Sequence, residues 1–155
     1  MTERIAGYRV APGGFKAMLG LEEYLHGTEL PVPLMHLCKL RASQINGCAY
    51  CIDMHWKDLR AIGEPEHRLY ALDAWRESPW YSDKERAALA WVEAVTLIHQ
   101  THAEDAMYEQ ARAHFSEKEL TDLTLLAATI NAWNRMAISL RSQPGHYASK
   151  LKPAT

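Results

Sequence analysis

Helical spacing of apolar residues is the feature of this sequence that most limits its fold. Along nearly the whole chain, apolar residues recur three and four positions apart, and no stretch alternates β-branched with polar residues. The first pattern lines one face of an α-helix, whereas a half-buried strand needs the second. The sequence therefore predicts an all-α fold.

Glycines, prolines and capping residues divide this pattern into helices. Ser82 and Ser116 each precede a glutamate by three residues and predict capping boxes, in which serine and glutamate satisfy free N–H groups at a helix start. Pro65 suits a first helical turn. We expect a short C-terminal extension from residue 143, and helices near residues 17–25, 34–45, 48–62, 65–79, 83–97, 102–114 and 117–138.

Size and charge narrow the class of protein. A chain of 155 residues is most simply one domain, here 1–155, and 48% apolar with 23% charged residues is typical of a globular protein. A net charge of −2 offers no basic surface for nucleic acid or an anionic membrane. No signal-peptide pattern and no membrane-length apolar run is visible, so we expect a cytoplasmic protein.

The segment from Asn46 to His55 carries the chemistry. Cys48 and Cys51 are three residues apart, and His55 follows the second cysteine by four. On a helix these side chains share one face. The sequence predicts a dithiol that can close into a disulfide beside an imidazole that can accept a thiol proton.

Two features compete to decide which cysteine is the more acidic. Asn46-Gly47 predicts a helix start at Cys48, where the helix dipole stabilises a thiolate, whereas His55 lies one turn beyond Cys51. Two other interpretations remain open. The cysteines can be buried apolar side chains, or Cys48, Cys51 and His55 can bind zinc with a fourth ligand from elsewhere.

Residues 40–55, LRASQINGCAYCIDMH, closely resemble the core of the AhpD-like alkylhydroperoxidases in the carboxymuconolactone decarboxylase family. Residues 131–135, NAWNR, resemble a second stretch of that family, and the likeness extends over about residues 15–140. The resemblance implies an all-helical fold with the CxxC pair at the start of a central helix. It also implies homo-oligomers, commonly trimers or hexamers, and thiol-dependent hydroperoxide reduction without metal, haem or another cofactor.

The resemblance also implies roles for individual residues. Cys51 would attack the peroxide and become a sulfenic acid, Cys48 would supply a proton and then close the disulfide, and His55 would relay protons. The family's lactone-decarboxylating branch lacks the dithiol, so its presence here argues against that reaction.

This chain departs from the family pattern at two positions. His36 stands where the family usually has a relay glutamate, twelve residues before the first cysteine, and Tyr50 replaces a histidine between the cysteines. Histidine can relay protons near neutral pH, but it cannot stabilise a charged His55 as a carboxylate does. His36 either faces the dithiol as a relay partner or only packs in the core. Tyr50 either lines the pocket mouth or packs.

Other residues of chemical interest are interpreted as structural. Cys38 points away from His36 and is expected to be an inert core thiol. Asn131 and Asn134 lie within an apolar helix and are expected to bond helix ends or a neighbouring subunit, since a buried amide needs partners. The tryptophans are expected in the core or an interface: Trp56, Trp75, Trp91 and Trp133.

The sequence thus predicts a homo-oligomeric thiol peroxidase of the alkylhydroperoxidase type. Its partners would be a hydroperoxide and an external dithiol, thioredoxin-like or lipoyl-bearing, with no nucleic acid or membrane. The C-terminal helices look too apolar for a lone monomer, which also favours subunit packing. The alternatives are a general disulfide reductase or redox relay, and a non-enzymatic redox-sensing oligomer.

Overall fold

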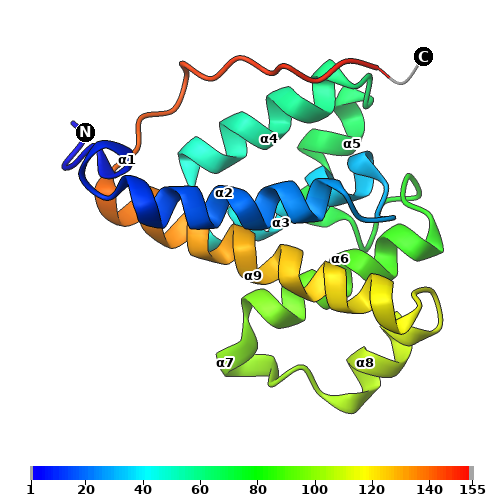
Figure 1. Cartoon of the computed structure of the whole chain (residues 1–155). Helices are drawn as coiled ribbons and strands as arrows, with labels where there is room; N and C mark the ends of the chain where they lie inside the picture. The colour runs from blue at the N-terminus through cyan, green and yellow to red at the C-terminus, as the bar shows by residue number, and fades with distance from the viewer. Residues whose placement is uncertain (1, 154–155) are drawn as a thin grey trace.

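The computed structural model describes residues 2–153, and every regular element in that range is a helix. Figure 1 shows α2 (Pro12–His26) lying along α9 (Glu117–Leu140), with α3 (Val32–Asn46) behind them. The other long helices are α4 (Ala49–Ala61), α6 (Asp83–Thr96) and α8 (Asp105–Arg112), and the short ones are α1 (Gly7–Val10), α5 (Glu66–Tyr70), the 3₁₀-helix η1 (Leu72–Ala74) and α7 (Ile98–Thr101). The predicted all-α fold is confirmed.

Helix α3 forms the centre of the core. It packs against α4, α6 and α9, and Leu37, Cys38 and Ala42 are each fully buried along it. The apolar residues of α9 contribute to the same core, with Leu123, Leu126 and Ile130 inaccessible to solvent. The apolar character of α9 is therefore satisfied largely within one chain. None of the described helices is long and apolar enough to cross a membrane.

The predicted capping boxes are both present. Ser82 accepts from the N–H of Glu85 and Ser116 from that of Glu119, and each glutamate accepts in return from the serine's N–H. At the C-terminus of α3, Gly47 adopts a φ of 70°, a left-handed conformation that glycine tolerates without strain. This glycine turns the chain directly into α4, so the motif from Asn46 to Cys48 joins two packed helices.

Three expected helices have different bounds in the structure. Helix α2 starts at Pro12, ahead of the helix expected near residues 17–25, and includes Gly13 and Gly14. The helix expected over 102–114 is wrong at its start, because His102 and Ala103 have φ values of 50° and 48° and α8 begins at Asp105. The helix expected over 65–79 is also wrong: it divides into α5, η1 and turns.

Arg86 explains the division of the 65–79 segment. Its guanidinium donates hydrogen bonds to the backbone carbonyls of Trp75, Arg76 and Ser78. These carbonyls therefore find a partner outside their own segment, and the chain need not continue as a helix to satisfy them.

A cluster of amides holds α3 to α9. Asn46 donates to the side-chain oxygens of Asn131 at 2.9 Å and Asn134 at 2.8 Å, and Asn134 donates to the hydroxyl of Ser43 at 3.1 Å. The expectation that Asn131 and Asn134 bond a helix end is confirmed, since Asn46 is the last residue of α3.

Replacing Asn134 with alanine should lower the free energy of unfolding by about 3 kcal/mol, because it removes two hydrogen bonds and leaves buried polar partners unsatisfied. Urea denaturation followed by circular dichroism measures this change. Ser139→Ala on the exposed face of the same helix is the control, with an expected change within about 0.5 kcal/mol. Equal effects of the two substitutions would contradict a structural role for the amide cluster.

Candidate functional site

The two cysteines of the CxxC pair are adjacent and buried. Their sulfur atoms are 2.6 Å apart, and each residue is 1% exposed. Cys48 is the N-cap of α4, and its sulfur accepts the N–H of Cys51 at 3.4 Å. The pair can therefore form a disulfide without rearrangement of the backbone.

The structure identifies Cys48 as the more acidic thiol. Hydrogen bonds from Cys51 lower its pKa from 9.0 to about 7, against the opposing effect of burial, with a further contribution from Asn134. The pKa of Cys51 is raised, because its proton is shared with the Cys48 sulfur and because the group is buried. The largest contribution thus comes from the neighbouring thiol, and the backbone N–H groups at the start of α4 add to it.

Titrating the reduced protein should therefore show one thiolate appearing with a midpoint near pH 7. The ultraviolet absorbance of thiolate follows this without requiring access to the buried sulfur. In Cys51→Ala, which removes the principal hydrogen-bond donor, the pKa of Cys48 should rise toward 9.0 and the midpoint should move up with it. A midpoint unchanged by Cys51→Ala would show that the neighbouring thiol does not stabilise the thiolate.

Cys51 opens onto a cavity of about 580 Å³, and Cys48 is not among its lining residues. The walls come from α1, α2, α3, α4, α9 and the C-terminal tail and are mostly apolar, with Phe15, Leu19, Met54, Trp133, Met136 and Leu140 among them. Since Leu19 and Tyr8 line the cavity and are 59% and 53% exposed, the cavity reaches the surface at α1 and α2. Tyr50 was expected either to line a pocket mouth or to pack. It lines the cavity and also packs against the core.

Two histidines face each other in the same cavity. The Nδ1 atoms of His36 and His55 are 3.3 Å apart, and both rings are about 4% exposed. His36 therefore lies against His55, as a relay partner would, and is not turned into the core. Within residues 2–153, no hydrogen bond joins either thiol to His55. The His55 imidazole and the Cys51 thiol instead line the same cavity.

Both imidazoles are neutral near pH 7. Burial, with the nearby Lys39 charge, lowers the pKa of His36 from 6.5 to about 4, although the carboxylate of Asp58 opposes this. The same causes hold the pKa of His55 well below its usual value, with His36 adding to them. A neutral ring has one protonated and one free nitrogen, so each can both donate and accept a proton.

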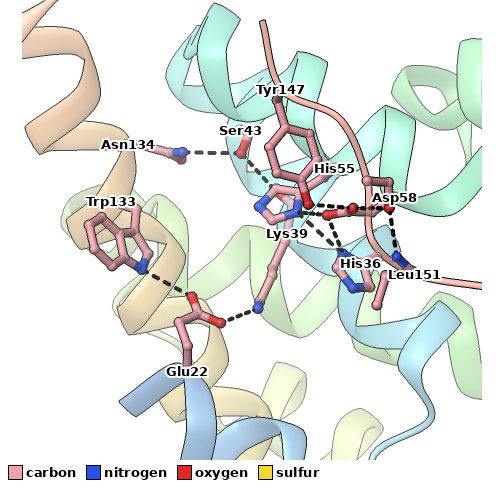
Figure 2. A network of polar contacts seen from close by, with 11 residues as sticks. Glu22, His36, Lys39, Ser43, His55, Asp58, Trp133, Asn134, Tyr147 and Leu151 are labelled. Carbon is pink, nitrogen blue, oxygen red and sulfur yellow. Dashed lines mark hydrogen bonds and ion pairs between the residues drawn. The ribbon is translucent and has the colours of Figure 1, made fainter. Parts of the chain in front are cut away.

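The carboxylate of Asp58 also lies beside the two histidines and was not predicted from the sequence. One oxygen of Asp58 lies 3.7 Å from His36 Nδ1 and 3.9 Å from His55 Nδ1, and its other oxygen accepts from the hydroxyls of Tyr147 at 2.7 Å and Ser149 at 2.6 Å (Figure 2). Asp58 follows His55 by three residues on α4, so the helical spacing that grouped Cys51 with His55 extends to it.

A buried ion pair lies beside the histidines and was also missed. Lys39, 2% exposed, contacts Glu22 at 2.5 Å, and Glu22 accepts the indole N–H of Trp133 at 3.0 Å (Figure 2). Trp133 packs against the core, as expected, and it also lines the cavity, which was not expected. Cys38 is fully buried and burial raises its pKa, as expected of an inert thiol.

The fold and the site together define a class of protein: an all-helical scaffold that presents a CxxC pair at a helix start to an internal cavity. A model of the carboxymuconolactone decarboxylase family matches residues 12–94, and this chain belongs to that family. Its motif and fold are those of the AhpD-like alkylhydroperoxidase group within it.

Individual relatives agree with this assignment. The chain is 42% identical over 140 residues to the uncharacterized protein YdfG of Bacillus subtilis, covering 90% of this chain and 95% of that one. An Agrobacterium tumefaciens structure, described as a protein of unknown function and a candidate antioxidant defence protein AhpD, is 45% identical with a TM-score of 0.91, covering 94% of this chain and all of the other.

More distant structures share the fold alone. A peroxidase-related protein with an alkylhydroperoxidase AhpD core from Ralstonia eutropha is 21% identical with a TM-score of 0.79, covering 90% of this chain and 74% of that one. The debrominase Bmp8 is 21% identical with a TM-score of 0.71, covering 84% of this chain and 70% of that one. The same helical scaffold therefore also occurs in a protein with another activity.

Proposed function

We propose that this protein is a thiol-dependent peroxidase that reduces organic hydroperoxides through Cys48 and Cys51. The observation that carries the proposal is the pair of sulfurs 2.6 Å apart, of which Cys51 alone opens onto a cavity with apolar walls and neutral imidazoles. Family membership supports the same chemistry.

The acidity of Cys48 and the position of Cys51 assign them different tasks. At pH 7, about half of Cys48 is a thiolate, which is stabilised by the hydrogen bond from the Cys51 thiol. As Cys51 attacks the distal peroxide oxygen, its proton passes to Cys48, the O–O bond breaks and Cys51 becomes a sulfenic acid. Cys48 therefore acts first as the base, as a neighbouring group does for other weakly acidic nucleophiles.

The departing alkoxide needs a proton, and the histidine pair can supply it. His55 lines the same cavity as Cys51, and His36 lies within hydrogen-bond distance of its ring. A proton donated by His55 to the alkoxide is replaced through His36. His36 takes up a proton from water as it passes its own proton to His55, and Asp58, near both rings, stabilises the positive charge that this protonation places on the pair.

The cycle closes at the dithiol. Cys48, protonated in the first step, loses this proton as its sulfur attacks the sulfur of the Cys51 sulfenic acid, and the hydroxyl leaves with the same proton as water, which gives the disulfide. An external dithiol reduces this bond by exchange. Because each cysteine is only 1% exposed, a narrow dithiol such as a lipoyl group fits this role better than the surface of a folded thioredoxin-like protein.

We also propose that the chain forms homo-oligomers. Large apolar side chains remain exposed on α1 and α2, at Tyr8, Val10 and Leu19, beside the mouth of the cavity. Covering them in a subunit interface removes apolar surface from water.

Thiol loss from the reduced, reductant-free protein tests the proposed activity. With cumene hydroperoxide, two thiols should disappear for each hydroperoxide converted to its alcohol. With insulin, a protein disulfide, thiol loss should be far slower because the buried pair cannot reach it. Rapid insulin reduction without hydroperoxide consumption would identify a disulfide reductase instead. If neither substrate reacts and oxidation changes only oligomer size, the protein is a redox sensor.

A further inference from the structure

Three potential metal-binding side chains converge beside the cavity, apart from the thiols. His36, His55 and Asp58 each offer one ligand atom, and these atoms all lie within 4.8 Å of one another. All three residues are buried and line the cavity. Figure 2 shows the two rings and the carboxylate pointing toward one another from α3 and α4.

The spacing of the two rings fits one tetrahedral ion. Nitrogen ligands lie about 2.0–2.1 Å from zinc, which places two of them roughly 3.3–3.4 Å apart at a tetrahedral angle. The Nδ1 atoms of His36 and His55 are 3.3 Å apart. The Asp58 oxygen, at 3.7 and 3.9 Å from them, must approach by roughly half an ångström, a small side-chain rotation.

The protonation states and hydrogen bonds of the three side chains also favour metal binding. Burial keeps both imidazoles neutral, and the neutral ring is the form that binds metal. Tyr147 and Ser149 donate to one oxygen of Asp58, which leaves the other oxygen facing the rings. Such hydrogen bonds orient the carboxylate ligands of metal sites.

The positive charge of Lys39 acts on both histidines of this cluster and repels a cation. It is paired with Glu22 at 2.5 Å, so much of its charge is compensated where it faces the cavity. The Asp58 carboxylate is the formal negative charge within the cluster itself.

We propose that His36, His55 and Asp58 form a binding site for one divalent transition-metal ion. Two imidazoles and one carboxylate select zinc or iron(II) over magnesium or calcium, which prefer oxygen ligands. Three protein ligands leave at least one coordination position open toward the cavity, as in metal sites that bind small molecules. The site differs from the zinc site considered on the cysteines, since it needs neither thiol.

Metal binding at this site does not depend on the proposed peroxidase activity, but a bound metal would affect that activity. A metal on Nδ1 of His55 occupies the nitrogen that faces His36, so metal binding and the proton relay exclude each other. If the peroxidase cycle is correct, zinc inhibits it.

Calorimetric titration with zinc or iron(II) tests the site in a protein that has no free CxxC thiols. The double variant Cys48→Ser, Cys51→Ser provides this background, and oxidised wild-type protein provides a second. One zinc ion per chain should bind, and magnesium should not. His36→Gln should weaken zinc binding more than tenfold, and His99→Gln on the surface should not change it.

Tyr147→Phe gives a second variant, because Tyr147 lies in the C-terminal tail outside the helical core. Loss of its hydroxyl should weaken zinc binding by about tenfold through the orientation of Asp58. Folding of each variant is checked by circular dichroism. The proposal is overturned if the thiol-free proteins bind neither zinc nor iron(II), if His36→Gln leaves affinity unchanged, or if X-ray absorption of the reduced zinc-bound protein shows sulfur ligands.

Discussion

Replacing Cys51 with serine is expected to lower the rate of hydroperoxide reduction at least ~10³-fold, because the substitution removes the nucleophile and the first covalent intermediate with it. Cys51 is the member of the pair that lines the cavity, so no other thiol can take its place at the peroxide. Stopped-flow mixing of reduced protein with cumene hydroperoxide measures this rate directly.

Cys38→Ala is the matched control for Cys51→Ser. Cys38 is the third cysteine, fully buried and absent from the cavity wall, so its removal should leave the rate unchanged. Near-wild-type peroxide consumption by Cys51→Ser would remove Cys51 from the mechanism and transfer the attack to Cys48 or to another part of the chain.

Replacing His55 with glutamine should lower kcat/KM for hydroperoxide by 10²–10⁴-fold, the range in which a general acid typically contributes. Glutamine has a similar length and can still form hydrogen bonds, but it does not transfer protons. His99→Gln, on the exposed surface, is the control and should retain full activity.

The pH profile separates a proton-transfer role for His55 from a structural one. In the wild-type protein, the rate should rise as Cys48 loses its proton near pH 7, and it should show no separate transition as His36 titrates near pH 4, where little thiolate remains. His55→Gln should keep the midpoint near pH 7 at a uniformly lower rate. If the variant instead melts early and recovers its rate at low temperature, the effect of the substitution is on folding.

Much of the fold could be predicted from the sequence because the signals that start and end helices act within a few residues. Both capping boxes and the glycine at position 47 act through backbone groups next to them, and each is present. The segment 65–79 was mispredicted because Arg86, from another helix, provides the partners of its carbonyls. A side chain that acts from outside a segment leaves no periodicity within it.

Part of the candidate site could likewise be predicted from local spacing, and part depends on contacts between helices. Helical spacing brought Cys48, Cys51 and His55 to one face of α4, and the same spacing extended by three residues reaches Asp58. The pairing of His36 with His55 joins two helices, which the family resemblance suggested and periodicity could not. Lys39 lies three residues after His36 on α3, but its ion pair with Glu22 depends on the packing of α2 and was not predictable.

The C-terminal tail was expected to be only a short extension, and its contacts are the largest omission. Tyr147 and Ser149 bond Asp58 from a segment without regular structure, which Figure 1 shows crossing alongside α4. Irregular segments have no repeating pattern that places their side chains, so these contacts emerge only from the three-dimensional arrangement.

In the proposed cycle, Cys51 is oxidised by peroxide and then forms a disulfide with Cys48. Trapping the sulfenic acid with a dimedone probe, followed by mass spectrometry of the peptides, tests this most directly. In Cys48→Ser treated with hydroperoxide, we expect one adduct on Cys51; in the wild-type protein, we expect a Cys48–Cys51 disulfide and little adduct. An adduct on Cys48 in Cys51→Ser, with none on Cys51 in Cys48→Ser, would contradict it.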